Sequence, residues 1–265
     1  MTQDDLVPPK TIEDLLHRRT DLSTFLIHLT KDTPGGPVAR DNLLSIASTG
    51  SILARSPFGP AKDLDSYLAA TGATQRAVCF TETPLEHAWM MVEEITGRQE
   101  RFQPYGIAIT KTTGRKSHVN PVWYTDITTR GGRDWPAKGI NELVTEAKDR
   151  ARTSGGIDAA LLAGEPIFKL TPFFEQMGPL TDGGRKEFFW EREWRHIGDY
   201  RIYPAQTFAI LAPEYDHERF RRDLQQKAPL WADRPILDPR WGLESMLAVL
   251  SGLAPSERGP FPALG

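Results

Sequence analysis

Two carboxylates stand among aromatic residues at positions 190–195, where the sequence is Trp-Glu-Arg-Glu-Trp-Arg. If residues 188–197 form a strand, alternation puts Glu191, Glu193 and Arg195 on one face, about 6.6 Å apart. Like charges and a partly apolar setting raise the pKa of a carboxyl group, so this pair suits acid–base or electrostatic catalysis. The same residues also fit a solvated strand face with cross-strand ion pairs, and the segment alone leaves both interpretations open.

Other common chemistries lack their sequence signatures. The chain contains no G-x-x-x-x-G-K-[ST], no G-x-G-x-x-G after a strand, no H-E-x-x-H and no G-x-S-x-G. Its six His and one Cys are dispersed, so we expect no metal site. The single Cys79 excludes an intramolecular disulfide and favours a reducing compartment.

The composition is that of an ordinary globular protein. The chain has 265 residues, 39% hydrophobic and 25% charged, and its formal net charge of −3 excludes a globally basic nucleic-acid coat. No stretch approaches the ~18 apolar residues of a membrane span, and the N-terminus lacks a signal peptide. We therefore expect a cytoplasmic protein that does not contact a membrane.

Short strands with irregular connections must position the two carboxylates. The pattern lacks the regular strand–helix alternation of a parallel sheet, so it favours an α+β fold with a mainly antiparallel sheet split into two packed halves around a cleft. A capping box, Thr83-Pro84-Leu85-Glu86, predicts a helix that ends near Gly97. Strands are expected at 24–30, 77–80, 105–110, 119–124, 188–197 and 207–211, and further helices at 12–18, 41–49, 142–152, 215–227 and 243–250.

These elements suggest three parts of the chain. Residues 1–20 form a polar N-terminal arm, and residues 21–227 form the main domain. An insertion rich in Gly and Pro interrupts this domain near 130–187. Residues 228–265 form a Pro-rich C-terminal tail.

The order of four motifs resembles AbiGi-type abortive-infection proteins. The motifs are a first-strand His28-x-Thr30, an Asp-Asn-Leu-Leu-x-Ile helix that ends at Gly50, a Cys-Phe-Thr-Glu-Thr-Pro-Leu junction at 79–85, and a late Glu-x-Glu-Trp-Arg strand. The pattern is similar in turn to DarT toxins, whose first motif is a His followed by an Asn-Leu-x-x-Ile-Leu helix and whose last is a strand Glu. The resemblance covers about 24–212 and implies an ADP-ribosyltransferase-like split β-sandwich with peripheral helices.

The resemblance implies a role for each matching residue. His28, with Thr30 beside it, would hold the ribose or amide of NAD, although a His on an apolar strand is also an ordinary core residue. Asn42 would contact NAD, or would simply cap its helix. Glu193 would be catalytic, because a fixed anion stabilises the positive charge that develops as nicotinamide leaves. Glu191 would assist it or face the acceptor.

Three further positions follow from the same resemblance. Thr81 would support the catalytic Glu with its hydroxyl. Arg76 would bind the pyrophosphate or replace a catalytic Arg of DarT toxins. The aromatic residue that stacks on nicotinamide is open among Tyr105, Phe80 and Tyr67.

The resemblance implies an NAD-consuming ADP-ribosyltransferase-like toxin or effector of a phage-defence or toxin–antitoxin system, without a metal and with an antitoxin partner. Its acceptor would be nucleic acid or protein. Basic residues at 111–118, with Arg130 and Arg133, form either a phosphate-binding patch or a solvated surface. Alternatives are a non-catalytic toxin-neutralising or scaffold protein and, with less support, a nuclease that uses Glu191, Glu193 and a divalent cation.

The catalytic hypothesis places His28 and Glu193 in one cleft. It also predicts that Glu193→Gln slows transfer by roughly 10²–10³-fold. For a solvent-facing Glu, the same change should leave folding almost unaffected.

Overall fold

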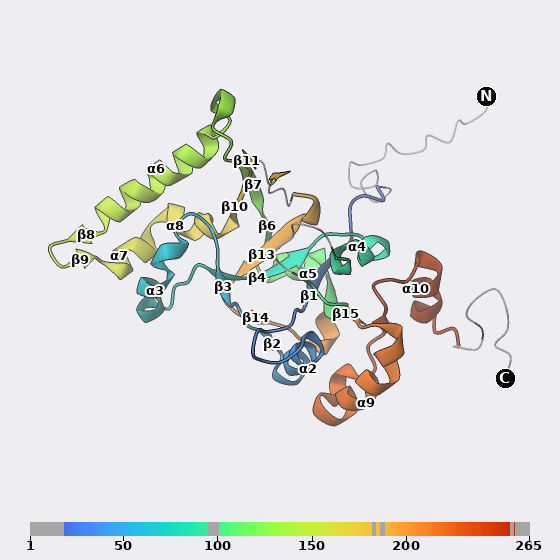
Figure 1. Cartoon of the computed structure of the whole chain (residues 1–265). Helices are drawn as coiled ribbons and strands as arrows, with labels where there is room; N and C mark the ends of the chain where they lie inside the picture. The colour runs from blue at the N-terminus through green and yellow to red at the C-terminus, as the bar shows by residue number, and fades with distance from the viewer. Residues whose placement is uncertain (1–18, 95–100, 182–183, 186–188, 255–256, 258–265) are drawn as a thin grey trace, which may run out of the picture.

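The computed structural model describes residues 19–94, 101–181, 184–185, 189–254 and 257. Its main feature is an eight-stranded sheet at the centre of the molecule (Figure 1). All pairings in this sheet are antiparallel except that of β15 with β16, which confirms the expected α+β fold with a mainly antiparallel sheet. The strand order is β16 (Ile236–Leu237), β15 (Thr207–Leu211), β5 (Gly106–Thr110), β1 (Phe25–Leu29), β4 (Arg76–Thr81), β13 (Glu193–Ile197) and β6 (Asn120–Pro121), with β3 (Ser56–Pro57) beside β4.

The sheet is split between β1 and β4. These strands share one residue pair, Ile27 with Thr81. By contrast, β1 pairs with β5 from Phe25 to Leu29, and β4 pairs with β13 from Ala77 to Thr81. The expected division into two halves is therefore present, with β16, β15, β5 and β1 on one side and β4, β13, β6 and β3 on the other.

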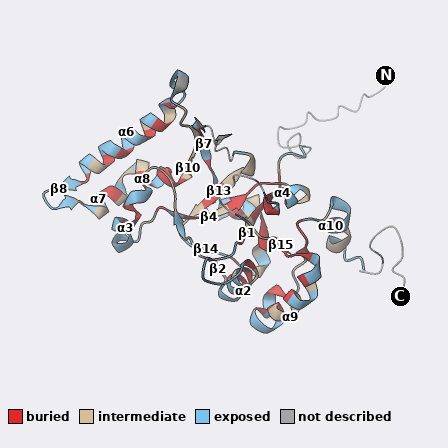
Figure 2. Cartoon of the chain, viewed as in Figure 1, coloured by how far each residue is buried: buried red, intermediate tan, exposed pale blue. Residues whose placement is uncertain are grey.

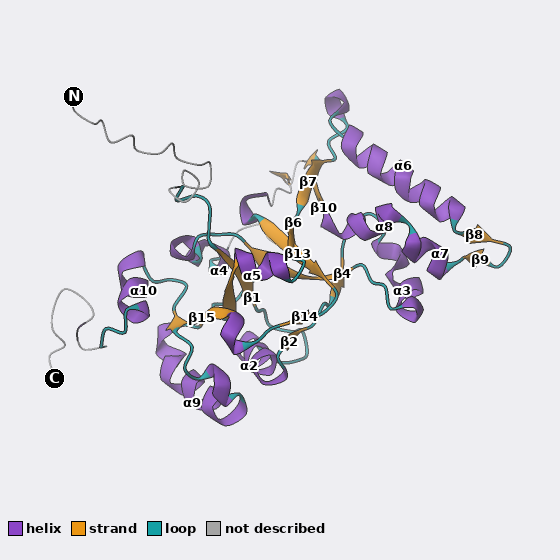
Figure 3. Cartoon of the chain, turned by 180° about the vertical axis from the view of Figure 1, so that it is seen from behind, coloured by secondary structure: helices purple, strands orange, loops and turns teal. Residues whose placement is uncertain are grey.

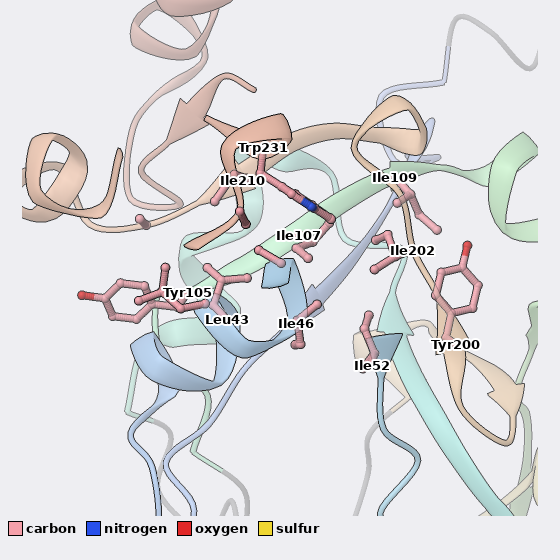
Figure 4. Packing of buried hydrophobic residues seen from close by; sticks show 14 of the residues in the cluster. Leu43, Ile46, Ile52, Tyr105, Ile107, Ile109, Tyr200, Ile202, Ile210 and Trp231 are labelled. Atoms are coloured by element: carbon pink, nitrogen blue, oxygen red, sulfur yellow. The ribbon is translucent and has the colours of Figure 1, made fainter. Parts of the chain in front are cut away.

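Two helices, α2 (Ala39–Thr49) and α9 (His217–Lys227), pack on one face of the first half. Helix α2 ends as expected at Gly50, whose left-handed φ of 64° lets its N–H reach the carbonyl of Ile46. Arg40 joins the two helices, because its guanidinium donates to Asp216 and Asp223, each at 2.6 Å. The apolar side chains beneath include Leu43, Ile46, Ile107, Ile210 and Trp231 (Figure 4).

The opposite face has a second, smaller core. Ile27, Leu29 and Leu237 from the strands pack with Met91 of α4 (Trp89–Val92). Partly buried Val249 of α10 (Leu243–Leu250) closes this cluster. Because Trp231 and Leu237 are buried in these two cores, the first part of the expected C-terminal tail belongs to the sheet.

The expected insertion near 130–187 is largely helical and has a third core. It contains α6 (Trp135–Arg150), α7 (Ala159–Gly164) and α8 (Pro166–Leu170), and its buried side chains pack against α3 (Asp65–Leu68). Figures 1 and 3 show these helices at one end of the molecule, away from α9 and α10. The buried stripe of α6 faces α7 and α8, and its other side is exposed (Figure 2). Its strand β10 (Phe174–Met177) pairs in parallel with β7 (Trp123–Asp126).

The remaining elements are short. The pairs are β2 (Ser51–Ile52) with β14 (Tyr200–Arg201), β8 (Arg152–Thr153) with β9 (Gly156–Ile157), and β11 (Leu180–Thr181) with β12 (Gly184–Arg185). One further helix is α5 (Lys111–Lys116). The 3₁₀ turns are η1 (Lys62–Leu64), η2 (Ala69–Thr71), η3 (Leu85–His87), η4 (Arg130–Gly132), η5 (Thr171–Phe173), η6 (Phe189–Glu191), η7 (Pro204–Gln206), η8 (Glu214–Asp216) and η9 (Pro229–Trp231).

The capping-box helix is the largest difference from the expected elements. In place of one helix to Gly97, the chain forms η3 and then α4, which ends at Val92 because Glu93 is extended. The hydroxyl of Thr83 bonds that of Thr81 at 2.8 Å and does not cap a helix. Residues 95–100, and 1–18 with the expected helix at 12–18, lie outside the described residues.

The boundaries of several other elements also differ from the expected ones. The expected strand at 188–197 begins only at Glu193, because η6 precedes it and Arg192 has a left-handed φ of 47°. The expected basic loop at 111–118 contains helix α5, which is capped by the Thr110 side chain. The expected strand at 119–124 divides into β6 and β7, and α6 is longer than 142–152. The elements expected at 207–211 and 243–250 have the predicted bounds.

A substitution at Gly59 would test the close contact between the segment before η1 and the insertion. It has a φ of +81°, and a Cβ there would lie 1.8 Å from the carbonyl oxygen of Thr171. Gly72 has a similar φ of +74° but open space around it, so Gly72→Ala should cost only backbone strain, about 1–3 kcal/mol. We expect Gly59→Ala to lower the free energy of unfolding by about 1–3 kcal/mol more, measured by urea denaturation. Equal losses in both variants would contradict this contact.

Candidate functional site

A cavity of about 920 Å³ lies along the split between β1 and β4. Its size is at the upper end of the range for sites of small molecules and cofactors. The cavity wall takes residues from both halves of the sheet, from α2 and from β10 of the insertion. The sequence-predicted residues that line it are His28, Thr30, Asn42, Phe80, Thr81, Glu191 and Glu193.

His28 lines the cavity and bridges the split between β1 and β4. Its Nδ1 lies 2.8 Å from the carbonyl oxygen of Cys79 on β4. Burial lowers the pKa of His28, and the bond to that carbonyl opposes the shift only in part. The neutral imidazole therefore donates from Nδ1 to the carbonyl, which leaves Nε2 as an acceptor. His28 is thus a strand residue with a fixed hydrogen bond that also faces the cavity.

Thr30 and Asn42 organise the loop that follows β1. The hydroxyl of Thr30 lies within hydrogen-bond distance of the Ala39 carbonyl, at 2.9 Å, and the Tyr105 carbonyl, at 3.0 Å. The amide of Asn42 donates to the Lys31 carbonyl at 2.8 Å and to other loop atoms. The alternative role of Asn42 as a helix cap is wrong, because Val38 is the N-cap of α2.

Glu193 is held by the buried guanidinium of Arg195. Nε of Arg195 donates to Oε1 of Glu193 at 2.9 Å, and Nη2 donates to Oε2 at 2.8 Å. The Glu193 side chain is 16% exposed, whereas that of Arg195 is 1% exposed. The backbone N–H of Glu193 donates to the hydroxyl of Tyr124 at 3.0 Å. Glu193 is therefore mostly buried and not solvent-facing as expected, and the small effect of Glu193→Gln on folding stays a prediction.

Arg195 also contacts the insertion. Its Nη1 donates to the Pro172 carbonyl, and its Nη2 donates to Glu175, both at 2.6 Å. The guanidinium carbon lies 3.9 Å from the centroid of the Phe58 ring. Burial by itself would lower the pKa of Arg195, but the Glu193 and Glu175 carboxylates outweigh burial and raise it. Arg195 therefore stays charged and fixes one wall of the cavity.

Glu191 lies in a turn and not on the strand face that the sequence suggested. Its carbonyl accepts a hydrogen bond from the hydroxyl of Thr81. Thr81 thus supports the turn before Glu193, and not the Glu193 carboxylate, in this structure. Glu191 still lines the same cavity as Glu193, although the two side chains do not share a strand face.

Glu82 fixes this turn, and our sequence analysis did not identify it as a site residue. Its buried carboxylate accepts from Arg192 at 2.9 Å, from the indole N–H of Trp194 at 2.7 Å and from Lys111 at 2.6 Å. The N–H of Glu82 also donates to the carbonyl of Arg192 at 3.1 Å. A carboxylate two residues after the apolar residues 77–80 was the available signal, since burial there requires donors.

Arg76 and Tyr105 do not line the cavity. Arg76 donates to Asp65 at 2.8 Å from the opposite end of β4 to Thr81. The hydroxyl of Tyr105 lies 3.1 Å from Asp216, and burial together with this carboxylate raises the pKa of Tyr105. Tyr67 is exposed and does not line the cavity. Of the three expected stacking residues, Phe80 is therefore the one on the cavity wall.

Two broader expectations concern metals and membranes. Within the described residues, no group of three or more His, Cys, Asp and Glu side chains is arranged to hold a metal ion. None of the helices in that part is both long enough and apolar enough to span a membrane.

Comparison with known proteins assigns this split-sheet chain to the abortive phage resistance proteins. A family model described as "Putative abortive phage resistance protein AbiGi, antitoxin" matches residues 62–227. The chain belongs to the AbiGi family, which confirms the resemblance that the sequence motifs indicated. No curated protein matches it. Among solved structures it is similar to DarT of Thermus sp. 2.9 in complex with NAD⁺, with a TM-score of 0.35 and 14% identity over 83% of this chain and 97% of that chain.

The pKa of His28 predicts a pH dependence of stability. An unfolded His has a pKa of about 6.5, and burial lowers the folded value, so the unfolded state binds more protons as the pH falls below 6.5. The stability conferred by neutral His28 is therefore complete above about pH 6.5 and is lost in acid. We expect His28→Gln to reduce the acid slope of the unfolding free energy by up to about 1.4 kcal/mol per pH unit.

The measurement is urea denaturation between pH 5 and pH 8. His87→Gln is the control, because the His87 side chain is 52% exposed and should leave the slope unchanged. A His28→Gln protein with the wild-type slope would show that His28 does not carry the effect.

Proposed function

We propose that the chain binds NAD in the cavity and uses Glu193 to transfer ADP-ribose to nucleic acid or protein during abortive phage defence. The observation that supports this most is the cavity itself. It brings together His28 from one half of the sheet with Thr81 and Glu193 from the other half, as an NAD site at the split requires.

The charges around the cavity suit the two charged groups of NAD⁺, its pyrophosphate and its nicotinamide ring. Lys31 and Arg55 line it near Thr33, whose hydroxyl accepts from Arg55 at 3.5 Å. These cations would attract the anionic pyrophosphate. Glu193 lies beside Arg195 in another part of the wall, where its carboxylate would attract the cationic nicotinamide ring.

The proposed reaction breaks the bond between ribose C1′ and the nicotinamide nitrogen, and nicotinamide leaves with the bonding electrons. A nucleophile of the acceptor then bonds to C1′ and loses its proton. Glu193 would accept a hydrogen bond from the ribose 2′-hydroxyl and stabilise the positive charge that develops at C1′. Glu191, in the adjacent turn, would face the acceptor and take its proton.

A second candidate is a non-catalytic neutralising partner of a toxin. The family description includes the word antitoxin, and α6 exposes Trp135 by 74% and Leu143 by 48% on its outer surface. Exposed aromatic side chains of this kind are common at protein interfaces. A protein with this role would bind its partner through such a surface and would not release nicotinamide from NAD.

Glu193→Gln tests catalysis directly. The change preserves shape and removes the charge, so nicotinamide release and transfer of labelled ADP-ribose should slow by roughly 10²–10³-fold. Glu191→Gln should have a smaller effect, because Glu191 would act on the acceptor. Unfolding by urea is measured in parallel, because loss of a carboxylate partner from buried Arg195 costs up to about 3–5 kcal/mol.

Glu165→Gln provides the matched control. Glu165 also receives two hydrogen bonds from an arginine, Arg150, but does not line the cavity. Wild-type protein that releases no nicotinamide with a range of nucleic-acid and protein acceptors would exclude the enzyme and leave the neutralising role. An active protein whose folded Glu193→Gln variant retains full activity would remove Glu193 from the mechanism.

A further inference from the structure

The start of β13 is bonded to a side chain from outside the eight-stranded sheet. The backbone N–H of Glu193 donates to the hydroxyl of Tyr124 at 3.0 Å. Tyr124 belongs to β7, which forms a separate two-stranded ribbon with β10. Tyr124 itself does not line the cavity, so the structure connects its hydroxyl to the site through Glu193.

Both backbone polar groups of Glu193 bond to the same short segment of chain. Its N–H donates to the Tyr124 hydroxyl, and its carbonyl accepts from the N–H of Val122 at 2.9 Å. The next residue of that segment, Trp123, packs edge to face on Phe174 of β10, with 5.0 Å between the ring centroids. Residues 122–124 therefore set the backbone position from which the Glu193 carboxylate extends.

The register of the β7–β10 ribbon also supports the Glu193 side chain. Tyr124 is aligned with Glu175 in the parallel pairing, and aligned residues of neighbouring strands point to the same side of a sheet. Glu175 accepts from Arg195 at 2.6 Å, and Arg195 in turn donates to the Glu193 carboxylate. The ribbon thus supports Glu193 at its backbone through Tyr124 and at its side chain through Arg195.

The hydroxyl of Tyr124 stays protonated beside these carboxylates. Burial raises the pKa of Tyr124, and the charges of Glu193 and Glu191 raise it further, whereas the bond from the Glu193 N–H and the charge of Arg195 oppose the rise only in part. A neutral phenol oxygen accepts a hydrogen bond and keeps its own hydrogen to donate. The bond from Glu193 therefore does not depend on ionisation of Tyr124.

We propose that Tyr124 is a positioning residue for Glu193, and that its hydroxyl fixes the backbone that carries the catalytic carboxylate. This inference rests on the proposed function, which makes Glu193 the group that stabilises positive charge at C1′. Such stabilisation requires a carboxylate held within about 0.5 Å of its productive position. Loss of the hydroxyl would remove the acceptor of the Glu193 N–H and loosen the start of β13. The chemical step would then slow more than binding of NAD⁺ weakens.

The experiment measures kcat and KM for nicotinamide release from NAD⁺ by the full chain, in wild type and in Tyr124→Phe. Phenylalanine preserves the ring and removes only the hydroxyl. We expect kcat to fall by about 10-fold to 100-fold, the scale of a misplacement of about 1 Å. KM should change by less than about twofold, because Tyr124 does not line the cavity.

A double-mutant cycle tests whether Tyr124 acts through Glu193. In a Glu193→Gln protein, Tyr124→Phe should change the residual kcat by less than about threefold, because the carboxylate that it positions is already absent. Tyr105→Phe is the matched control, since it also removes a hydroxyl that contacts a buried carboxylate, that of Asp216 at 3.1 Å, and Tyr105 does not line the cavity. It should leave kcat and KM unchanged.

Urea denaturation of each variant checks that the proteins compared are folded. Wild-type protein that releases no nicotinamide would overturn the proposed function, and this role of Tyr124 with it. In an active protein, a folded Tyr124→Phe variant with the wild-type kcat, or one with equal losses in both backgrounds, would overturn the role of Tyr124 alone. If Tyr124→Phe does not fold, amide hydrogen exchange of wild-type Glu193, measured by NMR, decides: a protected amide supports the contact, and exchange as fast as that of a free amide overturns it.

Discussion

The geometry of the site depends on the hydrogen bonds and ion pairs that the buried carboxylate of Glu82 accepts. It lies directly after the point where Ile27 and Thr81 join the two halves of the sheet. Lys111 reaches it from the end of β5 in the first half, and Arg192 and Trp194 reach it from the second half. A buried charge without these donors would cost several kcal/mol, so the halves and the turn before Glu193 are held in one arrangement.

Where β1 and β4 separate, backbone polar groups that face the split need hydrogen-bond partners other than a neighbouring strand. The carbonyl of Cys79 faces the gap and receives Nδ1 of His28, which replaces part of the missing ladder between β1 and β4. Buried carbonyl groups need such donors, and a histidine on β1 supplies one while Nε2 remains available. His28 therefore satisfies a carbonyl that the opening between the strands leaves without a strand partner, and it presents a polar atom to the cavity.

The sequence predicted elements where periodicity and turn chemistry agreed with tertiary packing. Strand β15 and helix α10 have the expected bounds, and Gly50 ends α2 as expected. The helix predicted from the capping box did not form as one helix. The hydroxyl of Thr83, which should have capped it, instead bonds the hydroxyl of Thr81. The strand alternation predicted for Glu191 and Glu193 was wrong for a similar reason. Arg192 has a left-handed φ and contacts Glu82, which is far away in the sequence. The motifs predicted seven residues that line the cavity, but Arg76 and Tyr105 could not be assigned elsewhere without their partners Asp65 and Asp216.

Arg195 shows why burial and function cannot be separated at Glu193. A carboxylate that stabilises developing positive charge must be rigid and must keep negative charge in its surroundings. Arg195 provides the rigidity through two hydrogen bonds. Glu175 of β10 accepts from the same guanidinium, so the insertion also orients the group that holds Glu193. Because Glu175 comes from the insertion, the packing of the insertion contributes to the position of a carboxylate that lies on the sheet.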